Sequence, residues 1–369
     1  MKKRILILVN HEIVIYNFRR ELVDALLEQG YEVYISSPYG KKLDYFIEKG
    51  CIFKEISIDR HGINPFKDLR IIRTYKKLIR EIKPYCILTY TIKPNLYGAI
   101  AAKRTQVHVI ANITGLGTAV ENGGILQKIT ILMYKYAFSN IQTVFFQNEE
   151  NMQFFKEKNI AVGKHKLLPG SGVNLTQFQP LEYPNDNTIE FVFISRIMKQ
   201  KGIDQYLEAA KYIREKYPFT RFHICGFCEE EYENILKDYQ NKGFIEYHGL
   251  MNDIRDILKV THCTVHPTYY PEGMSNVLLE SCASARPIIT TNRSGCREIV
   301  DDSINGYIVK QQNTKSLICA LEKFLNLSNE QRKQMGISGR KKVEKEFDRK
   351  IVINAYIQSI EMGEEKNEL

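Results

Sequence analysis

Two carboxylates of this chain, those of Glu272 and Glu280, are separated by seven residues within residues 266–302. A carboxylate accepts hydrogen bonds from hydroxyl groups. We therefore expect Glu272 to contact the hydroxyls of a sugar and Glu280, two turns into a helix, to reach the diol of a ribose. Glutamates at this spacing are also common on solvent-exposed helices, so the spacing alone leaves both interpretations open.

The residues around the two glutamates predict a strand, a turn and a helix. The sequence THCTVHP, residues 261–267, is typical of the end of a buried strand, and Pro271 and Gly273 indicate a turn. Ser275 can cap the helix that the apolar spacing predicts over residues 276–285. Unpaired backbone N–H groups at such a helix start carry partial positive charge, which suits a diphosphate.

Taken whole, residues 266–302 resemble the donor-site signature of glycosyltransferase family 4, whose members are retaining enzymes of GT-B fold. The agreement includes the glycine turn, the two glutamates, the apolar helix, Arg286-Pro287 and the later segment Gly295-Cys296-Arg297-Glu298-Ile299-Val300. A second segment, FVFISRIMKQKG at residues 191–202, is similar to the family's strand that ends in Ser/Gly-Arg and is followed by Lys-Gly.

The resemblance implies a fold and a set of site residues. The fold is α/β of the GT-B type, with two Rossmann-like domains whose parallel sheets face a central cleft. Arg196 and Lys201 are implied to bind the donor diphosphate and, with Glu272, to be the catalytic residues. The expected donor contacts are Glu280, Gly273, Met274, Ser275, Asn276, Gly226, Gly115 and Gly117.

Two glycine-containing loops each have a second interpretation. Cys225-Gly226-Phe227-Cys228 follows a predicted strand, where the family has a Gly-x-Gly loop and where C-x-x-C can also be a thioredoxin-like redox pair. Gly115 and Gly117 let the backbone approach a sugar closely, or they form an ordinary strand-to-helix turn. Many family members have His-Gly where this chain has Thr114-Gly115.

The chain contains no Asp-x-Asp sequence, the carboxylate pair that holds a divalent metal in the other large glycosyltransferase fold. We therefore expect no metal and no cofactor, because Arg196, Lys201 and the helix start at residues 274–276 would neutralise the leaving diphosphate. The family implies front-face attack, in which the departing phosphate takes the acceptor proton and no side-chain nucleophile is required. Three histidines are interpreted as packed strand-end residues: His248, His262 and His266.

Strand and helix signals alternate along the chain, which favours parallel sheets built from β-α-β units. Gly, Pro and Asn cluster over residues 168–187, so we place a hinge near residues 168–188. The predicted domains are an acceptor-binding domain, residues 1–168 joined by a C-terminal helix at 349–369, and a nucleotide-sugar-binding domain, residues 169–348. The predicted strands are residues 4–9, 31–36, 52–56, 86–90, 107–112, 143–147, 190–195, 221–225, 245–247, 263–266, 287–290 and 306–309.

Three segments of the first domain resemble a subset of family 4, the enzymes of bacterial capsule and O-antigen polysaccharide assembly. They are residues 15–19, IYNFR, residues 89–98, TYTIKPNLYG, and residues 111–124, ANITGLGTAVENGG. A Lys-Pro-Asn turn can also be only a turn, and an arginine can simply begin a helix. The subset implies five acceptor contacts: Arg19, Asn17, Lys93, Asn95 and Thr114.

Positive charge is concentrated in the first domain. The chain has a net charge of +9, and residues 1–168 hold 26 Lys and Arg against 15 Asp and Glu. The helix predicted over residues 66–83 has an apolar side and a basic side. It is either a half-buried helix with a solvated face or a basic surface that rests on anionic phospholipid. No nucleic-acid-binding signature accompanies the charge, so we expect no nucleic-acid partner.

The location of the protein is predicted from what the sequence lacks. No apolar run approaches the roughly 20 residues that a transmembrane helix needs, and MKKRILILVN is interpreted as a first strand rather than a signal peptide. The eight cysteines are irregularly spaced and are expected to be free thiols. We therefore expect a cytoplasmic protein that associates peripherally with the cytosolic face of the inner membrane.

These observations predict a retaining, metal-independent glycosyltransferase of O-antigen, capsule or exopolysaccharide biosynthesis. It would move a hexose or N-acetylhexosamine, with GalNAc the first choice, from a UDP-sugar to an undecaprenyl-diphosphate-linked saccharide. One alternative is a UDP-sugar 2-epimerase of the same fold, although its sequence pattern does not match. Others are a non-catalytic sugar-nucleotide-binding partner of a polysaccharide assembly complex, expected to lack Glu272, Arg196 or Lys201, and a redox protein that uses Cys225 and Cys228.

Overall fold

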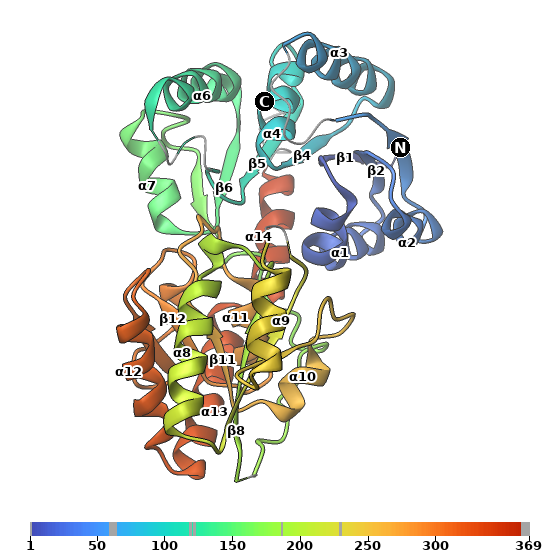
Figure 1. Ribbon diagram of the computed structural model, residues 1–369. Helices are drawn as coiled ribbons and strands as arrows, with labels where there is room; N and C mark the ends of the chain where they lie inside the picture. Colours follow the sequence, from blue (N-terminus) through green and yellow to red (C-terminus); the bar gives the residue numbers. More distant parts are fainter. Residues whose placement is uncertain are drawn as a thin grey trace. The chain divides into compact units, whose positions relative to one another are not determined.

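The computed structural model describes residues 2–58, 65–117, 120, 123–185, 187–228 and 231–362 (Figure 1). The chain divides into two compact units. Unit 1 comprises Met1–Ser171 and Lys350–Leu369, and unit 2 comprises Gly172–Arg349. Among the described residues, no helix is both long enough and apolar enough to cross a membrane.

Unit 1 is built on a parallel seven-stranded sheet in the order β3-β2-β1-β4-β5-β6-β7. Apolar side chains point alternately to its two faces: in β1, Ile5 and Ile7 pack on one face, and Leu6 and Leu8 on the other. A parallel sheet of this kind is normally covered on both faces. The strands are β1 (Arg4–Leu8), β2 (Glu32–Ser37), β3 (Ile52–Glu55), β4 (Cys86–Tyr90), β5 (His108–Ile113), β6 (Thr143–Phe146) and β7 (His165–Leu167).

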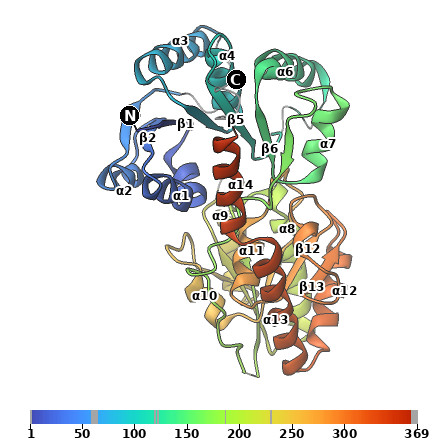
Figure 2. The same cartoon turned by 180° about the vertical axis from the view of Figure 1, so that it is seen from behind.

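Two layers of helices cover this sheet (Figures 1 and 2). One layer contains α3 (Pro65–Ile82), α4 (Ile92–Ala102), α6 (Gly124–Ala137) and α7 (Glu149–Glu157). The other contains α1 (Glu12–Glu28), α2 (Asp44–Glu48) and α14 (Arg349–Glu361). The ring of Tyr356 on α14 is fully buried 4.7 Å from that of Phe145 on β6, so the end of the chain completes the core of unit 1.

Unit 2 repeats the plan with a parallel six-stranded sheet in the order β10-β9-β8-β11-β12-β13. The chain runs from β8 outward to β9 and β10, and then returns to place β11 on the other side of β8. Such a reversal is where open α/β sheets bind ligands. The strands are β8 (Ile189–Ile194), β9 (Thr220–Cys225), β10 (Glu246–Tyr247), β11 (Cys263–His266), β12 (Ile288–Thr291) and β13 (Gly306–Val309).

Helices also cover both faces of the second sheet. One face carries α8 (Ile203–Lys216), α9 (Glu233–Asn241) and α12 (Thr314–Leu325), which lie in front of the sheet in Figure 1. The other carries α10 (Arg255–Val260), α11 (Asn276–Ala283) and the second half of α13 (Asn329–Glu346), which face the viewer in Figure 2. Short 3-10 turns are η1 (Lys41–Leu43), η2 (Phe138–Asn140), η3 (Lys199–Lys201) and η4 (Arg297–Ile299).

The predicted α/β fold with two parallel-sheet domains is confirmed, and two local predictions are corrected. Strand β7 was not predicted. Its three residues His-Lys-Leu lie at the sheet edge and are not fully buried, so they lack the apolar pattern that marks the other strands. Helix α11 ends at Ala283 rather than residue 285. Ala285 has a left-handed φ of 56°, and its N–H bonds to the carbonyl of Cys282, which stops the helix.

Candidate donor site and acceptor-side residues

The three predicted catalytic residues follow neighbouring strands of unit 2. Arg196 and Lys201 follow β8, and Glu272 follows β11. Because β8 and β11 are hydrogen-bonded neighbours at the point where the strand order reverses, their carboxyl ends present these side chains together. The sheet topology therefore unites two sequence motifs that lie about seventy residues apart.

Lys201 and Glu272 form a largely buried ion pair. The Lys201 ammonium donates a hydrogen bond to the Glu272 carboxylate, and their side chains are only 9% and 13% exposed. Nε2 of His266 lies 3.5 Å from Oε1 of the same carboxylate. Burial alone would raise the pKa of Glu272, but the Lys201 and His266 charges and hydrogen bonds outweigh it and hold that pKa well below its ordinary value. The carboxylate is thus ionised at all physiological pH values.

The ring of Tyr270 lies close to both Arg196 and Lys201. The Arg196 guanidinium carbon lies 5.3 Å from the centre of the Tyr270 ring, and the Lys201 Nζ lies 4.7 Å from it. An aromatic face attracts both cations, so Tyr270 gathers two positive groups within reach of one ligand. Tyr270 was not predicted from the sequence; its position two residues before Glu272, in the same turn, is the available signal.

Glycines permit close backbone contacts around these residues. A side chain on Gly202, which has φ +81°, would place its Cβ 2.1 Å from the carbonyl oxygen of Pro267 after β11. A Cβ on Gly226, with φ +143°, would lie 1.8 Å from the carbonyl oxygen of Ser195 after β8. Both positions therefore need glycine, and the three loops after β8, β9 and β11 are held against one another at backbone distance.

Helix α11 begins at the predicted diphosphate position. Ser275 is its N-cap residue but makes no side-chain capping bond, contrary to expectation; its N–H donates to the carbonyl of Gly295 instead. Met274 and Ser275 are buried, whereas Asn276 is partly exposed, and its Oδ1 is buried without a hydrogen-bond partner. The first turn of α11 thus keeps one unpaired side-chain oxygen, that of Asn276, at the end of the sheet that holds Lys201.

Glu280 lies in the second turn of α11 and differs electrostatically from Glu272. Burial raises the pKa of Glu280 to about 7; Arg349 lowers it and Asp253 raises it, both to a smaller extent. A desolvated carboxyl poised near neutrality is typical of ligand-binding sites.

The predicted acceptor residues of unit 1 lie in two settings, buried and nearer to solvent. Arg19 is 2% exposed, with its guanidinium carbon 5.1 Å from the Tyr90 ring centre. Asn95 is buried, accepting a bond from Thr89 and donating one to the Asn112 carbonyl. Both side chains are therefore part of the packed interior of unit 1.

The other predicted acceptor residues lie nearer to solvent. Nζ of Lys93 forms an ion pair of 3.1 Å with Oδ1 of Asp68 on α3, and Asn17 is exposed on α1. Thr114 and the glycines Gly115 and Gly117 follow β5, partly exposed. Residues 118–119 and 121–122 of the matching 111–124 segment lie outside the described residues. Asn17 is thus exposed, and Lys93 and Thr114 are partly exposed.

The histidines and cysteines constrain the remaining interpretations. His266 ends β11 and His262 directly precedes that strand, and both are buried as interpreted, but His248 is exposed and that interpretation is wrong for it. All eight cysteines are free. Burial raises the pKa of Cys225 to about 12, whereas a redox-active C-x-x-C needs an easily ionised thiol. The geometry therefore does not favour the redox alternative.

Two family models match this chain, one in each unit. "Glycosyl transferases group 1" matches residues 176–342, and "Glycosyl transferase 4-like" matches residues 4–148. Together they span nearly all of both sheets, including the strand ends that carry Lys201 and Glu272.

Curated relatives are similar over most of their length. A Campylobacter jejuni protein named N,N'-diacetylbacillosaminyl-diphospho-undecaprenol alpha-1,3-N-acetylgalactosaminyltransferase is 24% identical, covering 82% of this chain and 84% of that protein. The capsular polysaccharide biosynthesis glycosyltransferase CapM of Staphylococcus aureus is 28% identical, covering 90% of each. An Escherichia coli UDP-Gal:alpha-D-GlcNAc-diphosphoundecaprenol alpha-1,3-galactosyltransferase is 28% identical, covering 75% of this chain and 77% of that protein.

A solved structure shows the same architecture. The crystal structure of a glycosyltransferase from Rickettsia africae matches with a TM-score of 0.81 at 16% identity and covers 98% of each chain. At this identity the likeness concerns the fold, and it extends through both units.

Proposed function

The chain belongs to the family 4-like glycosyltransferases of GT-B fold, and we propose that it extends a lipid-linked saccharide in bacterial surface-polysaccharide biosynthesis. The donor is a UDP-sugar and the acceptor an undecaprenyl-diphosphate-linked saccharide. The names of the C. jejuni and E. coli relatives, which specify diphosphoundecaprenol acceptors, support this acceptor class. GalNAc is the first choice of transferred sugar because the C. jejuni relative is named for it.

The observation that carries the proposal is the Lys201–Glu272 pair beside Arg196 at the ends of β8 and β11. We assign the donor diphosphate to Arg196, Lys201 and the first N–H groups of α11. Glu272 accepts a hydrogen bond from a hydroxyl of the transferred sugar, and Glu280 accepts from the ribose diol. The two ends of the nucleotide sugar are thereby fixed by different carboxylates.

The reaction needs charge stabilisation more than a side-chain nucleophile. The bond between the anomeric carbon and the phosphate oxygen breaks, and the acceptor hydroxyl oxygen forms the new bond on the same face of the sugar. Because the new bond forms on the face that the phosphate leaves, the anomeric configuration is retained. The hydroxyl proton passes to the departing phosphate oxygen, so no side chain changes its charge. Preorganised cations aimed at the leaving group are usually the largest catalytic contribution. Two cations and a helix start perform this role without a metal in our proposal.

The lipid acceptor also requires a membrane surface, and two helices of unit 1 offer one. On α3, the basic residues Arg70, Arg73, Lys76, Lys77 and Arg80 are all exposed. On α6, Ile125, Ile129 and Leu132 form an apolar stripe, with Ile125 78% and Leu132 65% exposed. Both helices pack on the same face of the sheet. We assign this layer to the anionic cytosolic leaflet, with α3 binding head groups and α6 entering the interface.

A turnover screen tests the proposal. Purified protein would be incubated in EDTA with UDP-, GDP- and ADP-sugars, using undecaprenyl-diphosphate-linked GlcNAc and GalNAc as acceptors. We expect product from one UDP-sugar, with retained anomeric configuration by NMR. Product from a GDP- or ADP-sugar alone would overturn the donor assignment, and loss of activity in EDTA with recovery in Mg²⁺ would overturn metal independence. Binding of UDP without any turnover would favour the non-catalytic partner.

A further inference from the structure

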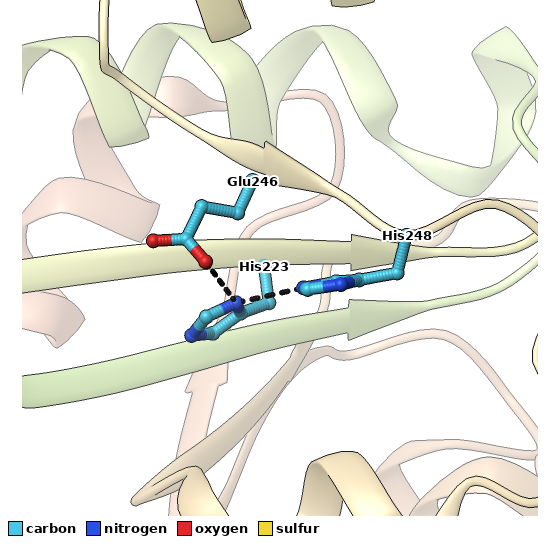
Figure 3. Close-up of side chains that lie close together, drawn as sticks. All are labelled: His223, Glu246 and His248. Carbon is cyan, nitrogen blue, oxygen red and sulfur yellow. Dashed lines mark hydrogen bonds and ion pairs between the residues drawn. The ribbon is translucent and has the colours of Figure 1, made fainter.

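A second cluster of chemically reactive side chains lies at the free edge of the unit 2 sheet. His223 is on β9, Glu246 on the edge strand β10, and His248 directly after it. Glu246 is paired with His223 in the parallel register, and His248 is two residues beyond Glu246. Because side chains two residues apart on a strand share a face, all three project from one side of the sheet edge, as Figure 3 shows.

The three side chains approach one another at the spacing of metal ligands. Nδ1 of His223 lies 3.0 Å from Nε2 of His248 and 3.6 Å from Oε2 of Glu246 (Figure 3). All three ligand atoms lie within 4.8 Å of one another. In a tetrahedral zinc site with bonds of about 2.0–2.1 Å, ligand atoms are about 3.3 Å apart. Small side-chain rotations therefore suffice to bring the three atoms around one ion.

A fourth residue orients the buried histidine for this task. His223 is 3% exposed, and its Nε2 lies 2.9 Å from Oε2 of Glu190 on β8. A carboxylate at this distance takes the Nε2 proton as a hydrogen bond and leaves the Nδ1 lone pair facing His248 and Glu246. Metal-binding histidines characteristically donate their second ring nitrogen to a carboxylate in this way. Arg221, 3.9 Å from the other Glu190 oxygen, balances the charge of that carboxylate.

The cluster is open to solvent and separate from the donor-site residues. Glu246 and His248 are exposed, so an ion and its water ligand can reach the site. The edge strand β10 is separated from β8 by β9, whereas Lys201 and Glu272 follow β8 and β11. Edge strand β10 is only two residues long, so an ion bridging β9 and β10 would fasten the weakest strand of the sheet.

We propose that His223, His248 and Glu246 bind one divalent transition-metal ion, best matched by Zn²⁺, with water as the fourth ligand. Two imidazole nitrogens and a carboxylate are ligands that zinc commonly takes. The ion stabilises unit 2 and has no part in sugar transfer. This proposal is independent of the glycosyltransferase assignment, because binding is measured without substrate.

Zinc binding to the purified full-length chain tests this site. Untagged protein would be stripped with EDTA, dialysed and titrated with ZnCl₂ by calorimetry. We expect one ion per chain and a higher thermal unfolding temperature when zinc is bound. His248→Ala and Glu246→Gln are exposed substitutions that preserve the core, and each should weaken zinc binding at least ten-fold. Glu233→Gln, an exposed acid on α9 outside the cluster, should leave the affinity unchanged.

X-ray absorption of the zinc-loaded chain gives a second, independent readout. We expect two nitrogen ligands of imidazole type with the remainder oxygen, and one imidazole fewer in His248→Ala. The proposal is overturned if wild-type protein binds no zinc in a one-to-one ratio. It is equally overturned if His248→Ala binds zinc with wild-type affinity and spectrum, which would place the ion elsewhere.

Discussion

At the residue scale, Lys201 and Glu272 depend on each other. Either charge left alone in a site this buried would lose its partner and its solvation together. The residue types of both motifs could be predicted from the sequence, but their pairing could not, because it depends on β11 returning to the side of β8. Tyr270 was missed for the same reason, since its contacts are with cations on a different strand end.

Substituting Glu272 separates binding from catalysis. Glu272→Ala should lower kcat by about 10²–10³-fold, the usual cost of losing one group that stabilises the transition state. UDP affinity should change little, since UDP contains none of the transferred sugar. Turnover assays and calorimetric UDP titrations measure the two effects, and Glu215→Gln, an exposed acid on α8, is the matched control. Survival of turnover in Glu272→Ala would contradict the catalytic assignment.

Glu280 imposes a pH-dependent cost on folding. Its pKa is about 7 in the folded chain against an ordinary value of 4.5, so the native state holds the proton more tightly. Stability contributed by this group is therefore present at low pH and lost as pH rises through 7. One pKa unit corresponds to about 1.4 kcal/mol, so Glu280→Gln should raise the free energy of unfolding at pH 8 by about 1–3 kcal/mol.

Urea unfolding at pH 5 and pH 8 measures this effect, and the gain of Glu280→Gln should shrink toward pH 5. Glu280→Gln should bind UDP more weakly than wild type does, because the amide is a weaker acceptor for the ribose diol. A gain in stability with a loss in binding is the signature of a residue retained for function. A variant that is less stable than wild type at pH 8 would show that Glu280 is a structural residue.

At the element scale, periodicity predicts elements with an apolar pattern of their own, and it misses features that depend on a neighbouring element. The apolar central strands of both sheets could be predicted from their own residues, whereas β7 owes its strand conformation to pairing with β6. The end of α11 is set by a left-handed alanine, a residue type that gives no stop signal. Amphipathicity located α3, and only burial shows that its basic side faces solvent.

Charge and apolar area on the α3–α6 layer should contribute to membrane binding in distinguishable ways. Changing Arg73, Lys76, Lys77 and Arg80 to Gln should weaken binding to vesicles containing anionic lipid at least ten-fold, since each near-surface cation adds about 1 kcal/mol. The loss should diminish at high salt. Vesicle sedimentation over a salt series measures it. Changing Leu132 to Gln on α6 should weaken binding at all salt concentrations alike.

The matched control for the basic helix lies in unit 2. Lys323, Lys333, Lys341 and Lys345 are four exposed lysines on α12 and α13, and changing them to Gln removes the same charge without touching α3. That variant should bind vesicles as wild type does. If both variants lose vesicle binding equally, the effect comes from overall net charge rather than from α3. If neither variant loses vesicle binding, the basic side of α3 is only a solvated face.

At the scale of the whole molecule, the two units use one strand order, each with a reversal beside its first strand. Alternating strand and helix signals predict parallel sheets, but they do not state which strands are neighbours, and that order decides which loops meet. The positive charge that distinguishes residues 1–168 from the rest of the chain is likewise a total over many residues and belongs to no single motif. The assignment of donor binding to unit 2 and acceptor binding to unit 1 is therefore a proposal, and testing it needs a measurement that resolves individual segments of the chain.

Hydrogen exchange with and without UDP provides that measurement. A ligand that binds only the native state stabilises it by about 2.7 kcal/mol at 100 times its Kd, and local protection appears where the contacts are made. We expect UDP to slow exchange in peptides covering residues 195–202 and 272–280 of unit 2. Peptides covering residues 15–19 and 89–98 of unit 1 should change little. UDP is part of the donor and not of the acceptor, so the unit that it protects is the donor-binding unit. Protection confined to unit 1 would therefore reverse the assignment of donor and acceptor to the two units.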